Sequence, residues 1–243
     1  MKLGPRAGVT LMELIIAITL VSLLSVGILM AMRVGLDAME KTNNRVIANR
    51  RALGAQQVLE QQIAGLIVTT ADCRMDPSAA PVELPFFQGQ PQSMRFVSSY
   101  SLQEAHRGYP RILEYQVIPA ENGAGVRLIV NERLYSGPYS TGALCIGPGG
   151  PRGTAMFRPI PAGPESFVLA DKLEICRFAY LRPSEQPGQP ENQTWTPVWE
   201  DMDFPLAIRI EMTPIERAPA RVPLITLTAP VRVNRNPRLL YVD

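Results

Sequence analysis

Glu13 is the residue near the N-terminus whose chemistry most needs an explanation. It stands in the stretch AGVTLMELIIAITLVSLLSVGILMAM, and the next charged residue is Arg33. A carboxylate carried to the centre of a bilayer costs about 2.5 to 3.5 kcal/mol, and less near the interface. The sequence therefore predicts that some interaction of Glu13 offsets this cost.

Catalytic and metal-binding patterns are missing from the rest of the sequence. His106 is the only histidine, and its setting QEAHRGYP indicates a loop with a solvated imidazole. No G-x-S-x-G motif, glycine-rich phosphate loop or Walker lysine occurs. Asp201 and Asp203 lack the D-x-D-x-D-G pattern of a calcium site and indicate a charged loop. We therefore predict no catalytic residue, metal, cofactor or small-molecule substrate.

Composition and the distribution of proline divide the chain into two parts. Lys+Arg 24 against Asp+Glu 22 gives a net charge of +2 with scattered arginines, so no nucleic-acid partner is predicted. No proline occurs between Pro5 and Pro77, whereas 22 of the 23 prolines lie from Pro77 onward. Because proline breaks helices, the first part predicts one long helix and the second predicts turns, loops and edge strands.

The long helix is expected to begin in a membrane. The uncharged run 14–32 is about 28 Å long at 1.5 Å per residue, which matches the thickness of bilayer hydrocarbon. We predict a transmembrane half at 9–33 and an amphipathic half at 34–72 that leaves the membrane, and the resemblance described below implies that this second half is periplasmic. A secretory signal peptide would end in a small-residue cleavage site, which this sequence lacks, and a plain signal anchor leaves Glu13 unexplained. Apolar residues of the second half recur at helical spacing, at Val46, Leu53, Leu59, Ile63, Leu66 and Ile67.

Alternation of apolar and polar residues predicts antiparallel strands after the helix. The expected strands are 93–100, 111–118, 126–134, 173–180, 206–213 and 224–233, with a surface loop at 137–164 rich in Gly and Pro. The predicted fold class is α+β. Trp195 and Trp199 are expected to be packing residues. The expected inward residues are Met94, Phe96, Leu113, Tyr115, Val117, Val126, Leu128 and Val130.

The three cysteines show no CxxC or Cys/His spacing. An oxidising compartment would permit one disulfide and leave one thiol, and the sequence does not fix the pairing. We favour Cys73 with Cys145, because both lie in loop-like contexts where backbones can approach. Cys176 shares strand parity with Phe178 and Tyr180, which predicts a thiol that faces the core.

The segment GVTLMEL resembles the class III signal of type IV pilins and pseudopilins, normally Gly, Phe, Thr, Leu, any residue and Glu. The resemblance implies that 1–8 is a basic leader retained in the cytoplasm and that a prepilin peptidase cuts after Gly8. It implies N-methylation of Val9, a position usually occupied by Phe. It also implies that Glu13 neutralises the N-terminal amine of a neighbouring subunit, which favours the correct register of assembly.

Three further stretches, FFQGQPQSMRFVSS, LEICRFAYLRP and WTPVWEDMDFPLAIRIEM, resemble pseudopilin J of the type II secretion system. The resemblance touches most of the chain and fits least well at 137–166. It implies a pilin-like fold with a β-rich periplasmic domain at 73–243. It also implies a non-catalytic subunit of the pseudopilus tip that supports protein export across the outer membrane.

The same resemblance implies the partners and the location. The partners are the prepilin peptidase, the major pseudopilin and the other minor pseudopilins, which are H-, I- and K-like. The location is a single span of the bacterial inner membrane with the C-terminal domain in the periplasm, and then the pseudopilus. A minor type IV pilin of the W-like kind is the alternative, and a membrane-anchored periplasmic enzyme is the third interpretation.

Overall fold

The computed structural model describes residues 9–74, 78, 80–121, 123–148, 151–184, 193–215 and 225–232. The expected leader 1–8, with the cleavage position Gly8, lies outside the described residues. The chain divides into two compact units, Met1–Ala48 and Asn49–Asp243. The boundary between the units falls inside helix α1 (Leu11–Ala64). The expected division of the chain at 33/34 and 72/73 stays a prediction.

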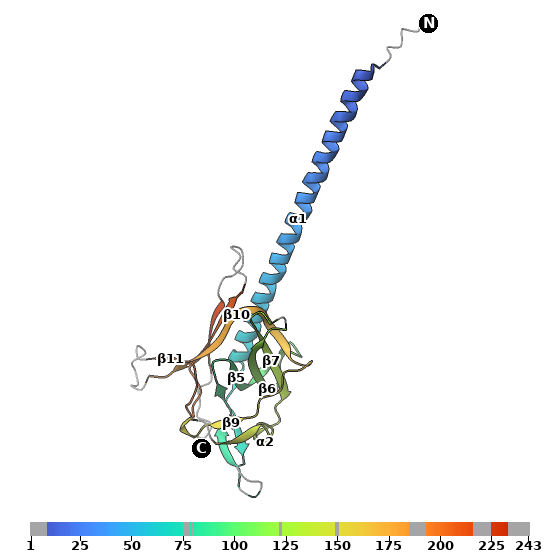
Figure 1. The fold of residues 1–243 in the computed structure, drawn as a ribbon. Helices are drawn as coiled ribbons and strands as arrows, with labels where there is room; N and C mark the ends of the chain where they lie inside the picture. The colour runs from blue at the N-terminus through green and yellow to red at the C-terminus, as the bar shows by residue number, and fades with distance from the viewer. Residues whose placement is uncertain are drawn as a thin grey trace. The chain divides into compact units, whose positions relative to one another are not determined.

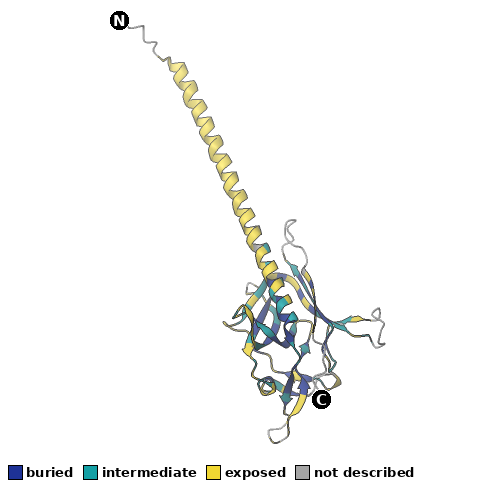
Figure 2. Ribbon diagram, turned by 180° about the vertical axis from the view of Figure 1, so that it is seen from behind, coloured by how far each residue is buried: buried dark blue, intermediate teal, exposed yellow. Residues whose placement is uncertain are grey.

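Helix α1 is 54 residues long, which matches the long stretch without proline (Figure 1). Among the described residues it is the one helix long and apolar enough to cross a membrane, and its most apolar window is not buried in the protein. Figure 2 shows its first part as exposed along its whole length. A membrane-spanning helix near the N-terminus, as expected from the sequence, is therefore consistent with its length and composition.

The end of α1 corrects the sequence prediction, which extended the helix to residue 72. The helix ends at Ala64, because Gly65 packs directly against the sheet: a Cβ at Gly65 would lie 2.8 Å from Ser98 Oγ. The four residues 67–70 that follow are all β-branched, which favours extended backbone. The chain therefore turns into the sheet two helical turns earlier than the apolar spacing indicates.

The second unit is built on a nine-stranded antiparallel sheet in the order β1-β5-β6-β7-β10-β12-β13, with β4 also paired to β5 and β11 to β10. The α+β class is therefore confirmed, and the six predicted strands correspond to β5, β6, β7, β10, β12 and β13. The short strands, the first five residues of β6 and the first six residues of β10 were not predicted. The bounds are β1 (Leu66–Ile67), β4 (Gln88–Gly89), β5 (Ser93–Ser101), β6 (His106–Pro119), β7 (Val126–Leu134), β10 (Phe167–Arg182), β11 (Thr194–Thr196), β12 (Ala207–Pro214) and β13 (Ile225–Pro230).

One face of the sheet packs on the last turns of α1 and forms the main core. Leu59 and Ile63 of α1 are fully buried in it. Six of the eight residues predicted to point inward are fully buried, and Val117 and Val126 are partly buried against the same core, so that prediction is confirmed. Trp199 is also buried there and donates its indole N–H to the Asp203 carbonyl at 2.7 Å, so its predicted packing role is confirmed.

The segment 137–164 is not the plain surface loop that its Gly and Pro content predicts. It contains α2 (Pro138–Gly142), β8 (Cys145–Pro148), the 3-10 turn η1 (Pro151–Gly153) and β9 (Ala155–Phe157). With the hairpin of β2 (Thr70–Cys73) and β3 (Val82–Pro85) it encloses a second core, which includes Phe86, Phe157 and Ile160. We call α2, β8, η1, β9 and the strap up to Ile160 the accessory lobe.

Candidate assembly site

The residues Val9 and Glu13 stand at the beginning of α1, and both are exposed. Thr10 caps the helix: the Glu13 N–H donates to Thr10 Oγ1 at 3.3 Å and to the Thr10 carbonyl at 3.1 Å. Thr-x-x-Glu is the spacing of a capping box. A carboxylate in the first turn also interacts favourably with the positive end of the helix dipole. The cap is therefore a local role of the Thr10 hydroxyl that the sequence analysis missed, although the spacing of Thr10 and Glu13 signals it.

Among the described residues, none forms an ion pair with Glu13. The next charged residue along the helix is Arg33, which twenty residues of α-helix place about 30 Å away. A capping box satisfies backbone donors but supplies no cation. Within the described part of the chain, the Glu13 carboxylate is thus left available for a positive charge from elsewhere.

In the second unit, a buried ion pair joins β5 to β6. Arg95 Nη2 and Glu114 Oε1 are 2.7 Å apart, and the two side chains are 3% and 4% exposed. Burial lowers the pKa of Arg95, and the neighbouring Glu114 carboxylate opposes that change. The pair holds the accessory lobe: Ile160 donates its N–H to Glu114 Oε2 at 2.7 Å, and Arg95 Nη2 donates to the Arg158 carbonyl at 2.9 Å. The geometry of the Arg95–Glu114 ion pair therefore indicates a structural role.

A polar network attaches the end of α1 to the sheet. Tyr115 donates its hydroxyl hydrogen to Gln62 Oε1, and Gln62 Nε2 donates to Glu132 Oε1 at 2.9 Å. Glu132 also accepts the Ser101 hydroxyl at 3.0 Å and the Leu102 N–H at 2.6 Å. Burial, with a smaller contribution from Glu132, raises the pKa of Tyr115 well above its ordinary value, so this phenol remains a neutral donor. The network fixes the helix end to the turn between β5 and β6.

Cys73 and Cys145, the pair favoured from the sequence, form a disulfide with their Cα atoms 5.5 Å apart. Both lie on short strands, β2 and β8, rather than in the loops expected for them. Cys176 is a free, buried cysteine on β10, and burial raises the pKa of its thiol to about 12. The disulfide therefore ties the accessory lobe to the hairpin of β2 and β3, and the third cysteine lies in the main core.

Breaking this disulfide is expected to lower the free energy of unfolding by about 2–4 kcal/mol, because the bond closes a long loop. The two cysteines are 72 residues apart. Urea unfolding of the full chain in detergent, with and without reductant, measures the change. Peptide mapping without reduction is expected to give a linked Cys73–Cys145 peptide and an unlinked Cys176 peptide. A bridged Cys176 would contradict the assignment.

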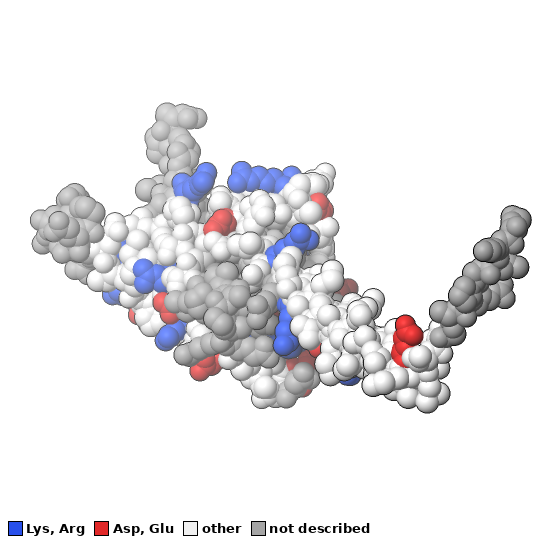
Figure 3. Space-filling view, turned by 90° about the horizontal axis from the view of Figure 1, so that it is seen from above, with Lys and Arg blue, Asp and Glu red and all other residues white. Residues whose placement is uncertain are grey.

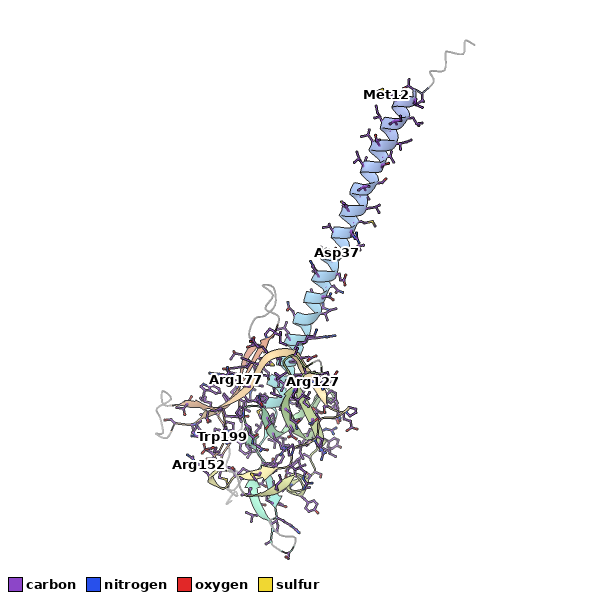
Figure 4. All side chains as sticks on the ribbon, viewed as in Figure 1. Met12, Asp37, Arg127, Arg152, Arg177 and Trp199 are labelled. Atoms are coloured by element: carbon purple, nitrogen blue, oxygen red, sulfur yellow. A yellow bond between two sulfur atoms is a disulfide. The ribbon has the colours of Figure 1, made fainter. Side chains whose placement is uncertain are left out.

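The residues that the sequence analysis considered for catalysis or metal binding do not lie together in one site. His106 is exposed, and it begins β6 opposite Ser101 rather than lying in a loop as expected. Asp201 accepts from Arg152 at 2.5 Å and from Arg182 at 2.9 Å, so it is the centre of surface ion pairs. Figure 4 labels Arg152, one of the two arginines that pair with Asp201, and Trp199, which lies two residues before Asp201 in the sequence. Within the described residues, no group of three or more His, Cys, Asp or Glu side chains is placed to hold a metal ion.

Charge on the surface is mixed. Figure 3 shows basic and acidic side chains interspersed over the face that it displays. Trp195 is half-buried beneath the Arg209 guanidinium. The guanidinium carbon lies 3.9 Å from the centre of the ring, which makes this a cation–π contact.

No protein-family model and no curated protein matches this chain.

Proposed function

We propose that the chain is a minor pseudopilin of the type II secretion system, similar to pseudopilin J, and a non-catalytic subunit of the pseudopilus tip. The observation that carries the proposal is the arrangement at the start of α1. The signal GVTLMEL runs into a 54-residue helix whose first-turn carboxylate, Glu13, has no cation among the described residues. The helix leads into an antiparallel sheet, an α+β arrangement that a pilin-like fold also has.

In this proposal, a prepilin peptidase cuts after Gly8, and the new amine of Val9 is methylated. A methylated amine stays cationic, and Glu13 neutralises that amine on a neighbouring subunit. The two charges offset each other's desolvation only when the subunits dock with the right axial offset. The leader and the C-terminal unit then lie on opposite sides of the inner membrane, with the C-terminal unit in the periplasm.

The alternative is a minor type IV pilin of the W-like kind, which would share the signal, the helix and a similar β domain. The segments around FFQGQPQSMRFVSS and WTPVWEDMDFPLAIRIEM favour the J-like subunit. A membrane-anchored enzyme has less support, because His106 and the carboxylates Asp201 and Asp203 occupy structural or exposed positions.

Deletion of this chain in its bacterial host is expected to leave exported proteins in the periplasm, while surface pili still form. The physical reason is that a tip subunit is needed to start the filament that drives export. Fractionation of periplasm and medium, with electron microscopy of surface pili, measures both outcomes, and complementation by the wild-type chain is the control. Normal export combined with a loss of surface pili would contradict the proposal and favour the pilin alternative.

A further inference from the structure

An open hollow lies at the turn from β5 into β6, within the second unit of the chain. Its volume is about 520 Å³, and the residues that line it are Glu104, His106, Gly108, Tyr109 and Pro110. Ligand sites in proteins have volumes of about 300–1,000 Å³ and combine apolar or aromatic surface with a few fixed polar groups. We call these five residues the β5–β6 hollow.

The turn that carries the β5–β6 hollow is held in one conformation. Glu132 Oε1 accepts the Leu102 N–H at 2.6 Å at the start of the turn. Ala105, which stands between Glu104 and His106, has a φ of 55°, a left-handed conformation that residues with a side chain seldom adopt. Strained positions of this kind persist where the surrounding structure fixes them, and they cluster at ligand sites. The backbone under the two polar residues of the hollow is therefore fixed.

Each of these two polar side chains bonds to the protein through one atom and keeps a second atom for a ligand. The Nδ1 atom of His106 lies 2.8 Å from the Arg107 carbonyl, and because a carbonyl only accepts, Nδ1 carries the hydrogen. The Nε2 atom of the neutral imidazole is then an acceptor. Glu104 Oε1 accepts from Arg111 at 2.5 Å, and within the described part of the chain no group donates to its Oε2. Both side chains therefore present an acceptor.

Gly108 lets the two acceptor side chains stand close together. A Cβ on Gly108 would lie 2.9 Å from Glu104 Oε2 and 3.2 Å from the Cε1 atom of His106. The carboxylate and the edge of the imidazole therefore share the space above a residue that has no side chain. Tyr109 and Pro110 supply the apolar wall of the hollow, and Tyr109 is 74% exposed, so its ring is open to a ligand.

Charge and hydrogen bonding restrict what the hollow can bind. A carboxylate or phosphate would set its own acceptors against the Glu104 carboxylate. A metal ion would find fewer side-chain ligands than a zinc site has, since the described residues include no group of three or more such ligands. An organic cation would find no net negative charge, because Arg111 already pairs with Glu104. A neutral ring that bears several hydroxyl groups meets every condition, because hydroxyls donate to acceptors and a C–H face packs on an aromatic ring.

We propose that the β5–β6 hollow binds a neutral saccharide. One hydroxyl group of the sugar donates to Glu104 Oε2, another donates to His106 Nε2, and the apolar face of the ring lies on Tyr109. A hydrogen bond to a carboxylate is about twice as strong as one between neutral groups, so Glu104 is the principal polar anchor. This function goes beyond the assembly of subunits and does not depend on it.

The test is saturation-transfer difference NMR on the full chain, in micelles of a polyoxyethylene ether detergent whose headgroup carries no sugar ring. The neutral probes are maltotriose, cellotriose and tri-N-acetylchitotriose, and the acidic probe is trigalacturonic acid. At least one neutral probe is expected to bind, about tenfold more tightly than the acidic probe. Absence of binding by every neutral probe, or equally tight binding of the acidic probe, would overturn the proposal.

Variants of the hollow locate the binding. Tyr109→Ala is expected to weaken binding of the neutral probe about tenfold, whereas Tyr109→Phe keeps the ring and should bind like the wild type. Glu104→Gln should also weaken binding, by about tenfold, because it removes the charged acceptor. Because Tyr109 is exposed, its replacement should leave the fold intact.

The matched control is Tyr139→Ala, which removes a tyrosine on α2 that is 76% exposed and does not line the hollow. Binding by this variant should equal that of the wild type. Unchanged binding by Tyr109→Ala, or an equal loss in Tyr109→Ala and Tyr139→Ala, would show that the sugar does not bind in the hollow. The purified chain needs neither peptidase nor export, so these results are independent of the secretion phenotype.

Discussion

The Glu13→Gln variant is expected to insert and fold like the wild type and to fail in assembly. Glutamine can still serve at this position of a capping box, so the start of α1 should persist. In the proposed assembly, this change removes the charge that neutralises the neighbouring amine, which leaves a buried cation without a partner. Breaking a buried pair costs about 3 kcal/mol or more, or roughly a hundredfold in the docking equilibrium. Membrane abundance and export per molecule, measured in the same cells, separate folding from assembly.

The control for Glu13→Gln is Thr10→Ala, which removes the cap and keeps the carboxylate. Loss of a threonine cap costs about 1 kcal/mol of helix stability. A helix of 54 residues should tolerate this, and export should continue. If Thr10→Ala stops export as completely as Glu13→Gln, the cap rather than the charge matters. If Glu13→Gln lowers abundance but leaves export per molecule unchanged, the charge-pairing account is wrong.

The second large effect is expected at the buried ion pair of β5 and β6. Glu114→Ala leaves the Arg95 guanidinium, now 3% exposed, without its carboxylate, and it also removes the acceptor of the Ile160 N–H. Removing one partner of a buried pair costs about 3–5 kcal/mol. The free energy of unfolding should fall by that amount, measured by urea unfolding of the full chain in detergent. Protease cleavage within the accessory lobe should also become faster.

Two variants control for Glu114→Ala. Glu121→Ala removes a carboxylate that is 78% exposed and pairs with Arg127 at 2.5 Å; it should change stability by less than about 1 kcal/mol. The double variant Arg95→Met with Glu114→Leu removes both charges and should recover much of the loss, because apolar replacement of a buried pair is often neutral. A double variant as unstable as Glu114→Ala would show that hydrogen bonds to the lobe, rather than the unpaired charge, cause the loss.

The main sheet could be predicted from the sequence because apolar residues recur at alternate positions of its long strands. Met94 and Phe96 on β5, for example, are fully buried in the main core, whereas Val97 on the other face of the strand is buried in the second core, which the sequence analysis did not predict. The short strands β2 and β8 have four residues each, too few for a period to be visible. The helix end at Ala64 depends on the contact of Gly65 with Ser98, which is distant in sequence.

The candidate site shows the same division between local and distant information. The Thr10–Glu13 cap is a four-residue pattern and could have been read from the sequence. The accessory lobe could not, because its anchors come from other strands: Glu114 and Gln116 on β6 bond the N–H and carbonyl of Ile160. The sequence analysis grouped Val46 and Leu53 with Leu59 at one helical spacing, but Val46 and Leu53 are 42% and 59% exposed, whereas Leu59 is fully buried in the main core.

The mass of the mature N-terminus tests the central claim most directly. Membranes of cells that express this chain with a prepilin peptidase are extracted, and the N-terminal peptide is analysed by mass spectrometry. The account predicts a chain that begins at Val9 with a methylated amine, and an uncut chain when the peptidase is absent. An intact Met1 in the presence of the peptidase, or a cut after about Met32 as expected for a secretory signal peptide, would contradict it.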